Sequence, residues 1–520
     1  MTDKIGNRFG VPALLLFLAV GMLFGPDGIG AWFDTDGNGI GYMINISSAQ
    51  ALGTIALCII LFSGGMDTKI KDIQPILVPG IILATIGVLL TAVITGIVVF
   101  YVFGWLHAVA AVTLPVALLM AACMSSTDSA SVFSILRTNG VGLKHNLRPL
   151  LELESGANDP MAYVLTITLI GIVTSGKADV SALAIIQDIL IQLVMGAVMG
   201  FAFGKLVVKI LKEVKLSNES LYPIMVLSAC IFIFGVTYYL KGNPYLAVYI
   251  GGLIIGNTRF IRKRQTKSFF DGLTWLAQLV MFLMLGLIVR PFELLSLKVW
   301  LPCLIISIVM IFVARPITVL ICMFPFKQYK LRDKMMLSWV GLKGAVPIIF
   351  AILCIANHVP NANLLFNVVF ACTLVSLIIQ GSSLSKVADK LKLAMPETGI
   401  EQKLVYFDID LPEEIQKQVR ELEVTNEMLV NGSMLRNAII PRDYRIVMIR
   451  HGESFIIPDG NTELHPNDIL LISSQKDAED AQRALEQAER EELEDIKLRV
   501  ITDTTGVIKN IWRKMKGEDK

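Results

Sequence analysis

The stretch LELESGANDPMAYVLTITLIGIVT, residues 151–174, places three acids immediately before a long apolar run. The chain around it is also apolar. Of its 520 residues, 54% are hydrophobic and only 17% are charged, whereas soluble domains average roughly 45–50% apolar residues. Acids inside a bilayer are rare and usually functional. The stretch therefore predicts a membrane protein that carries ionisable groups within the bilayer.

Apolar runs follow one another over the first three quarters of the chain. Those long enough for a span of ~20 residues number twelve, centred near residues 19, 55, 90, 120, 162, 195, 230, 250, 279, 311, 346 and 371. From Pro396 onward charge dominates, and no run could cross a bilayer. We predict an all-α polytopic membrane domain at 1–395, a small α/β cytoplasmic domain at 396–475 and a charged helical tail at 476–520.

The lysines and arginines indicate how the spans are oriented. If the N-terminus is cytoplasmic, the inner joints carry 22 of these residues and the outer joints only four: Lys177, Lys241, Arg290 and Lys298. Cytoplasmic loops of membrane proteins are enriched in positive charge. We therefore expect a multi-pass protein of the cytoplasmic (inner) membrane with both termini in the cytoplasm.

A further acid lies in the span that precedes the opening stretch. LPVALLMAACMSSTDSASVFSILR, residues 114–137, holds Asp128 among hydroxyl side chains, which compete for backbone hydrogen bonds and favour an unwound helix. Asp128 lies nine residues before Arg137, and Asp159 nine residues after Leu150. At ~1.5 Å per residue both are ~14 Å deep, near the middle of a ~30 Å core. The two carboxylates are predicted to share one midplane site.

Buried ion pairing is the alternative use for these acids. Arg315 and Lys343 are also mid-span by the same count, but two cations cannot neutralise Asp128, Asp159 and Glu154 together. At least one acid is left to hold either a proton or a cation. A site that binds either ion and is exposed alternately to the two sides of the membrane would make the protein an exchanger.

Other functional classes lack their sequence signatures. The seven cysteines all fall within predicted spans and, like the five histidines, show no metal-ligand spacing. No metal is therefore expected beyond the transported monovalent cation, and no nucleic-acid partner. An enzyme would need a Ser/His pair or a metal triad, which the sequence does not show. A ligand-gated potassium channel or leak pathway is the alternative function, although a filter sequence such as TVGYG is absent.

Two spans share a pattern that indicates internal duplication. PALLLFLAVGMLFG at 12–25 and PYLAVYIGGLIIG at 244–256 both begin with proline and end in G-x-x-x-G, and they are predicted to run in opposite directions. Such an inverted repeat is common in secondary transporters. In the same register, the span with Asp128 matches the span with GLKGAVP at 341–347. Both are expected to be helices broken at the midplane.

These motifs together resemble one transporter family. STDSAS at 126–131, the Asn-Asp pair in ESGANDP, ARP at 314–316 and GLKGAVPI at 341–348 are similar to the monovalent cation/proton antiporter-1 family of bacterial NhaP-type exchangers. The resemblance covers essentially the whole membrane domain. It implies an inverted-repeat bundle of thirteen helices, a homodimer in the lipid bilayer, and electroneutral exchange of K⁺ or Na⁺ for H⁺.

The resemblance also assigns roles to individual residues. It implies that Asp159 carries the proton or cation, with Asp128 as the second acid. The implied cation site consists of Thr127, Asp128, Ser155, Asn158 and Asp159. Glu154 and Arg315 would form a structural ion pair, and Lys343 would supply a counter-charge. Glu152 is expected to face the cytoplasmic entrance.

Two departures from the family pattern are visible. Where the family often has Thr-Asp-Pro, this chain has Ser129 after Asp128, so the helix break must arise without proline. The chain also begins at what corresponds to the family's second helix, which gives about twelve spans and a cytoplasmic N-terminus.

The soluble part has period-2 segments typical of strands, RIVMIR at 445–450, SFIIPDG at 454–460 and DILLISS at 468–474, and a further segment KLVYFDIDLP at 403–412. IQKQVRELEV at 415–424 is predicted to be helical. The region 402–475 resembles the TrkA-C (RCK-C) module of potassium transport proteins, which implies a dimerising regulatory domain. It could bind a nucleotide or serve only for dimerisation and docking; no other cofactor is expected. The tail GVIKNIWRKMKG at 506–517 is amphipathic, suited either to the anionic inner leaflet or to packing.

Overall fold

The computed structural model describes most of the membrane domain and part of the C-terminal region. It covers residues 13–29, 45–106, 112–175, 181–214, 218, 220–258, 260–294, 296–396, 419–424, 427–429, 433–437, 444–451, 454–466 and 468–474. The chain divides into two compact units, Met1–Glu397 and Thr398–Lys520. Each unit is described by itself.

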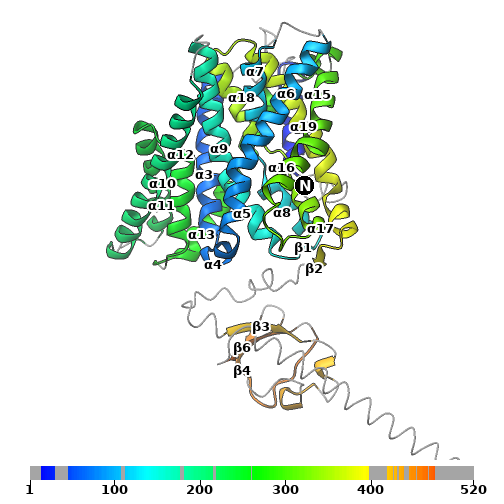
Figure 1. Ribbon diagram of the computed structural model, residues 1–520. Helices are drawn as coiled ribbons and strands as arrows, with labels where there is room; N and C mark the ends of the chain where they lie inside the picture. Colours follow the sequence, from blue (N-terminus) through cyan, green and yellow to red (C-terminus); the bar gives the residue numbers. More distant parts are fainter. Residues whose placement is uncertain are drawn as a thin grey trace, which may run out of the picture. The chain divides into compact units, whose positions relative to one another are not determined.

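The first unit is a bundle of helices (Figure 1). Eight helical segments of its described part are long and apolar enough to cross a membrane. Six are single helices: α3 (Ile46–Asp67), α9 (Leu147–Ser175), α10 (Ala182–Glu213), α11 (Leu221–Tyr239), α13 (Lys263–Ile288) and α19 (Ala362–Lys390). The other two are compound, one over Ile70–Trp105 and one over Val299–Cys322.

Both compound spans contain a turn of π-helix. The first consists of α4 (Ile70–Ile73), a short 3₁₀ turn, α5 (Leu77–Ile82), the π segment η4 (Leu83–Gly87) and α6 (Val88–Leu106). The second consists of α15 (Leu297–Val309), the π segment η5 (Met310–Ala314) and α16 (Arg315–Cys322). Pro316 has no N–H to donate, which explains why the regular ladder is interrupted there. Such π segments are frequent at functional sites, and η5 ends directly before Arg315.

The described part of the membrane unit also contains four shorter apolar helices, α2 (Ala13–Phe24), α7 (Leu114–Cys123), α12 (Pro244–Gly256) and α18 (Val346–Ala356), and the short helices α8 (Ser129–Thr138), α14 (Pro291–Leu294) and α17 (Leu331–Trp339). Together with the eight longer segments, the four apolar helices lie at the positions predicted from the sequence. The chain is a multi-pass membrane protein with broken helices. The total of twelve spans stays a prediction, because the short helices do not cross a bilayer by themselves.

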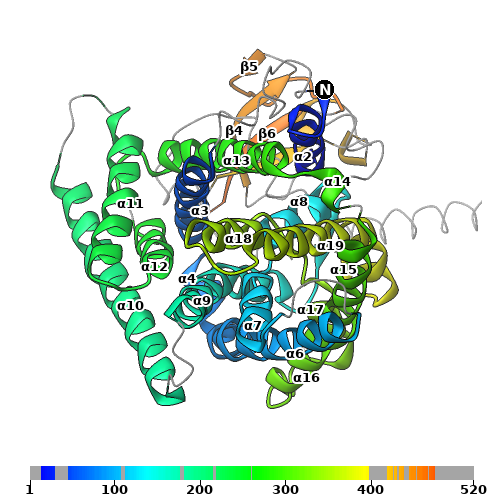
Figure 2. The same ribbon diagram turned by 90° about the horizontal axis from the view of Figure 1, so that it is seen from above.

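The two G-x-x-x-G motifs hold equivalent helix pairs together. In the first repeat Gly21 of α2 lies against the backbone of α13 at Leu283 and Gly286. In the second repeat Gly252 and Gly256 of α12 lie against the backbone of α3. Small residues let helix backbones approach closely. The first helix of each repeat thus packs on the second helix of the other repeat, as a two-fold related duplication requires (Figure 2).

Seen from above, the helices of the membrane unit fall into two groups (Figure 2). Helices α10, α11 and α12 lie together on one side, next to α3 and α13. Helices α6, α7, α9, α15, α18 and α19 lie together on the other side. The second group contains the predicted site residues. A short antiparallel pair, β1 (Val141–Leu143) with β2 (Ala394–Pro396), joins the loop before α9 to the end of the unit.

The second unit contains a four-stranded antiparallel sheet with strand order β3-β6-β4-β5. The strands are β3 (Val419–Glu423), β4 (Tyr444–His451), β5 (Ser454–Ile456) and β6 (Ile469–Ser474). Its small core consists of Val424, Ile449, Leu464, Leu470 and Ile472. The strands predicted at RIVMIR, SFIIPDG and DILLISS are confirmed. The segment KLVYFDIDLP and the tail after 474 lie outside the described residues.

One prediction about this unit is wrong. The segment Val419–Glu423, expected to be part of a helix, is strand β3 and pairs along its length with β6. Leu422 and Val424, two residues apart, both join the small core, as the period of a strand requires. β3 lies at the edge of the sheet, where charged residues such as Arg420, Glu421 and Glu423 are common.

Candidate functional site

Two unwound segments cross at the centre of the site. One follows α7 and comprises residues 124–128 before α8 (Ser129–Thr138). The other follows α17 (Leu331–Trp339) and comprises residues 340–345 before α18. The Asp128 N–H donates to the Leu342 carbonyl at 2.8 Å, so the two segments are joined through their main chains. Both broken helices predicted from the repeat register are therefore present, and the break near Asp128 forms without proline.

Charged side chains of opposite sign lie at the broken helix ends. The half-buried Asp128 carboxylate accepts hydrogen bonds from the Ser131 N–H at 3.1 Å and the Ser131 hydroxyl at 2.5 Å, at the N-terminus of α8. The buried Lys343 ammonium donates to the Ser126 carbonyl at 2.9 Å, just beyond the C-terminus of α7. These positions match the helix dipole, positive at the N-terminus and negative at the C-terminus. The two side chains thus stabilise the break.

Asp159 is brought to the crossing by α9. Its side chain is buried, and Oδ1 accepts a hydrogen bond from the Ser126 hydroxyl. Asp128 and Lys343 are both near enough to interact electrostatically with Asp159. The depth count placed Asp128 and Asp159 at one level, and the structure has both at the crossing.

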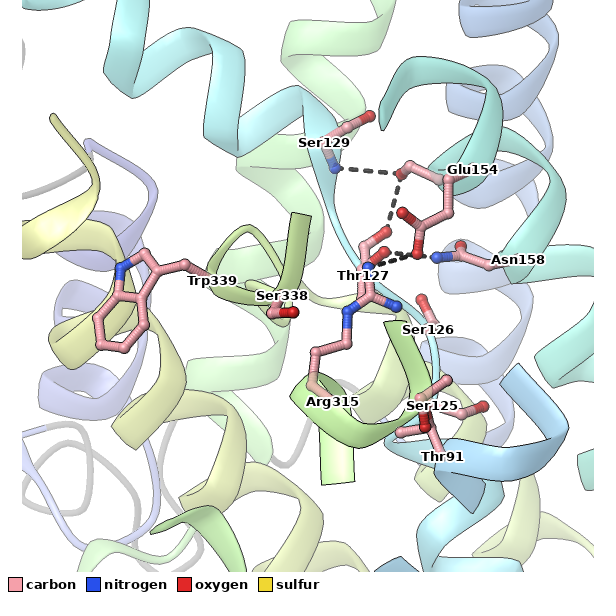
Figure 3. A network of polar contacts seen from close by, with 12 residues as sticks. Thr91, Ser125, Ser126, Thr127, Ser129, Glu154, Asn158, Arg315, Ser338 and Trp339 are labelled. Atoms are coloured by element: carbon pink, nitrogen blue, oxygen red, sulfur yellow. Dashed lines mark hydrogen bonds and ion pairs between the residues drawn. The ribbon is translucent and has the colours of Figure 1, made fainter. Parts of the chain in front are cut away.

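The same face of α9 binds the unwound segment through two more residues. Ser155, Asn158 and Asp159 share this face because they are spaced three and four residues apart. The Ser155 hydroxyl donates to the Thr127 carbonyl at 2.8 Å, and the Asn158 amide donates to the Thr127 hydroxyl at 2.5 Å (Figure 3). The Ser129 N–H in turn donates to the Ser155 hydroxyl at 3.1 Å. All five residues predicted for the cation site therefore meet here.

Asn158 has one oxygen that is available as a ligand. Its Oδ1 is buried and has no hydrogen-bond partner among the described residues. Buried polar atoms are usually paired, so each exception needs an explanation. Carbonyl, hydroxyl and carboxylate oxygens are the hard donors that alkali cations prefer over nitrogen or sulfur, and all three kinds occur among the residues gathered here.

Glu154 and Arg315 form a buried ion pair next to this network. Arg315 Nη2 lies 2.5 Å from Glu154 Oε1, and the side chains are only 6% and 1% exposed (Figure 3). The second carboxylate oxygen and the Arg315 Nε have no partner among the described residues. Glu152 is distinct from these groups. It pairs with Arg148 one turn earlier on α9 at 3.0 Å and is about one-third exposed.

Several residues that hold the site in place were not predicted. The Lys343 N–H donates to the Ser376 hydroxyl at 3.0 Å, that hydroxyl donates to Gln380 at 2.5 Å, and Gln380 donates to the Trp339 carbonyl at 2.8 Å. Helix α19 thereby holds the second unwound segment just before its start, at Trp339, and near its middle, at Lys343. Ser126 was noted only as a neighbour of Asp128. Polar residues in the otherwise apolar α19 were the available signal.

Two crossed, broken helices from inverted repeats, with buried acids at the crossing, define a secondary transporter. The sequence matches the family model for the transmembrane sodium/hydrogen exchanger over residues 2–390 and the TrkA-C domain model over residues 419–485. The chain belongs to the sodium/hydrogen exchanger family. It is a transporter and not an enzyme, and it carries a TrkA-C domain.

Relatives agree with this assignment, and a solved structure has a similar fold. The chain is 38% identical to the K(+)/H(+) antiporter NhaP of Alkalimonas amylolytica, covering 93% of this chain and 80% of that protein. It is 36% identical to K(+)/H(+) antiporter NhaP2 of Shewanella sp. (strain MR-4), covering 92% and 79%. The fold is similar to that of the sodium proton antiporter MjNhaP1 from Methanocaldococcus jannaschii, with a TM-score of 0.61, 24% identity and coverage of 75% and 95%. The resemblance seen in the sequence is confirmed, and the channel alternative finds no support.

Proposed function

We propose that the protein exchanges cytoplasmic K⁺ for H⁺ by alternating access at Asp159, with Na⁺ as the possible second substrate. The observation that carries the proposal is the position of this buried carboxylate at the crossing of the two unwound segments, hydrogen-bonded to Ser126. K⁺ is favoured because the two relatives described above are named K(+)/H(+) antiporters.

The chemistry of the exchange follows from the charge of one carboxyl group. Protonated, Asp159 is neutral and needs no cation. Ionised, it attracts a monovalent cation, which Thr127, Ser155, Asn158 and Asp128 would help to coordinate through oxygen atoms. A buried site disfavours an uncompensated charge, so proton and cation replace each other. Because one positive charge leaves for each that enters, the exchange is electroneutral.

The remaining charged residues support the site and do not carry ions. Glu154 and Arg315 neutralise each other and fix α9 against α16. The Lys343 ammonium donates a hydrogen bond to the Ser126 carbonyl and acts there as a fixed counter-charge. This division leaves Asp159 as the acid whose charge changes during transport, with Asp128 as an auxiliary ligand.

The cellular setting is proposed on the same basis. The charge distribution supports a location in the inner membrane with both termini in the cytoplasm. Family resemblance supports a homodimer. The TrkA-C domain is regulatory, and we propose that it senses a cytoplasmic ligand, with a nucleotide as one candidate. The domain boundaries are taken at 1–395, 396–475 and 476–520.

The test is proton efflux from acid-loaded proteoliposomes on addition of K⁺ and then Na⁺, with valinomycin present in the K⁺ experiment to clamp the potential. We expect efflux with K⁺ and its loss in Asp159→Asn, while insertion and yield are unchanged. The matched control is Asp188→Asn, the same change at an exposed position of α10. Unchanged turnover in Asp159→Asn, or equal loss in both variants, would overturn the site assignment.

A further inference from the structure

Three potential metal ligands meet at one end of the sheet in the TrkA-C domain. His451, His465 and Asp468 each offer one ligand atom, and these atoms all lie within 4.8 Å of one another. The spacing of the histidines along the chain gave no sign of this cluster. It arises from strand register, because β4 and β6 pair antiparallel with Arg450 opposite Ile469, and the next pair outward is His451 and Asp468.

The separations suit a single small ion. His451 Nδ1 lies 2.7 Å from Asp468 Oδ1, and His465 Nδ1 lies 3.9 Å from Asp468 Oδ2. For ligands about 2.0–2.1 Å from a tetrahedral zinc ion, neighbouring ligand atoms are about 3.4 Å apart. The His451 separation is a hydrogen-bond distance and shorter than that value, and the His465 separation, measured to the other carboxylate oxygen, is longer. An ion bound here would replace the hydrogen bond between His451 and Asp468.

The carboxylate at the centre of the cluster is held firmly. Asp468 is buried, and its Oδ2 accepts a hydrogen bond from the backbone N–H of His465 at 2.8 Å. Its own N–H donates to the His465 carbonyl at 3.1 Å, and its carbonyl accepts the Val424 N–H at 2.8 Å. Two of these bonds fix the main chain of Asp468 on the turn before β6, and the third fixes its carboxylate. A metal ligand that is fixed in advance loses little conformational entropy on binding.

The two imidazoles are accessible to solvent, and only that of His451 makes a hydrogen bond within the cluster. The His451 and His465 side chains are 49% and 54% exposed, and their ring centroids are 4.7 Å apart. The His465 ring makes no hydrogen bond to any described residue, since 3.9 Å to Asp468 is too long. A hydrogen-bonded pair of His451 and Asp468 would explain two of the three residues, but not the approach of the second imidazole.

The ligand types select the class of ion. Imidazole nitrogens with one carboxylate suit zinc and the neighbouring divalent transition metals, whereas Ca²⁺ and Mg²⁺ prefer oxygen donors. Three protein ligands, two of them exposed imidazoles, leave a coordination position open to water. We propose that His451, His465 and Asp468 form a binding site for one divalent transition-metal ion, Zn²⁺ in the first instance. Such an ion would tie the end of β4 to the turn before β6.

The test uses the full-length protein in detergent, with any affinity tag removed. Zn²⁺ binding is measured by titration calorimetry, and Co²⁺ is added as a spectroscopic probe of the coordination geometry. We expect one ion per chain, with d–d absorption bands of a four- or five-coordinate site. His465→Gln and His451→Gln should each weaken binding at least tenfold. His465→Gln is the primary variant, because the fold uses the backbone of His465 and not its ring.

His145→Gln is the matched control. His145 also contacts a buried aspartate through Nδ1, 2.9 Å from Asp333, and the described residues place no third metal ligand beside that pair. Its substitution should leave Zn²⁺ binding unchanged. The proposal is overturned if the wild-type protein binds no Zn²⁺ or Co²⁺, or if binding survives in His465→Gln and His451→Gln. Equal weakening in the control would also overturn it.

Discussion

Breaking the ion pair between Glu154 and Arg315 should destabilise the membrane unit far more than breaking an exposed pair. With charge centres about 4 Å apart and an effective dielectric constant of about 20, the Coulomb attraction is ~4 kcal/mol. Removing one partner also leaves the other charge buried and uncompensated, at a typical cost of about 3–5 kcal/mol. Arg315→Met alone should therefore lower the free energy of unfolding by about that amount.

The double variant distinguishes the net contribution of the ion pair from the cost of leaving one of its charges unpaired. In Glu154→Gln/Arg315→Met neither charge remains, so we expect most of the stability to return, leaving a deficit of about 1 kcal/mol, since replacing a whole buried pair is often nearly neutral. The measurement is unfolding of the purified protein in mixed micelles with increasing SDS, for the wild type, the two single variants and the double variant.

An exposed pair provides the control for this cycle. Lys267 and Asp67 lie 3.0 Å apart, but their side chains are 32% and 53% exposed. Lys267→Met should lower stability by about 0–1 kcal/mol, because solvent screens such pairs. The reasoning is refuted if Arg315→Met costs no more than Lys267→Met, or if the double variant loses the sum of its two single variants.

Three other outcomes are expected. Gly252→Val should destabilise the protein by about 1–3 kcal/mol because its side chain would strike the backbone of α3, whereas Gly235→Val, with open space around it, should change SDS unfolding by no more than about 1 kcal/mol. Lys343→Met should reduce the exchange rate at least tenfold, and proteoliposome assays with wild-type-like rates would contradict its role as a counter-charge. Acidification should raise the apparent KM for K⁺, up to tenfold per pH unit once Asp159 is mostly protonated, because proton and cation compete; a KM independent of pH would exclude a shared site.

The sequence allowed us to predict how deep the acidic residues lie in the membrane. It did not allow us to predict which helices contact one another across the bundle. Counting residues from the ends of two spans was enough to place Asp128 near Asp159, because helical rise is constant. Counting charges named Arg315 and Lys343 as candidate partners for the intramembrane acids, and the family resemblance paired Arg315 with Glu154. The support of Lys343 by Ser376 was not predictable in this way, since hydropathy does not show which side of α19 faces the second break.

In the soluble domain, too, the sequence did not reveal which segments pair with one another. Alternation identified β4 and β6, yet the charged segment at 419–423 fitted either a helix or an edge strand until its pairing with β6 was known. The meeting of His451 with Asp468 depends on the register of β4 and β6, two strands that β5 and a loop separate along the chain. Register follows from the packing of a whole sheet, so no local motif carries it.

The main-chain bond between Asp128 and Leu342 has a consequence for sequence variation. A contact made by backbone atoms tolerates almost any side chain, so those residues of 124–128 and 340–345 whose side chains the site does not use, such as Leu342, could vary while the crossing is preserved. Gly344 is the exception, because a Cβ atom there would collide with the Asp128 side chain. In a saturation mutagenesis library selected for growth, Leu342 should accept many apolar substitutions and Gly344 none. Where the site does not use a side chain of this crossing, tolerance would then follow backbone geometry.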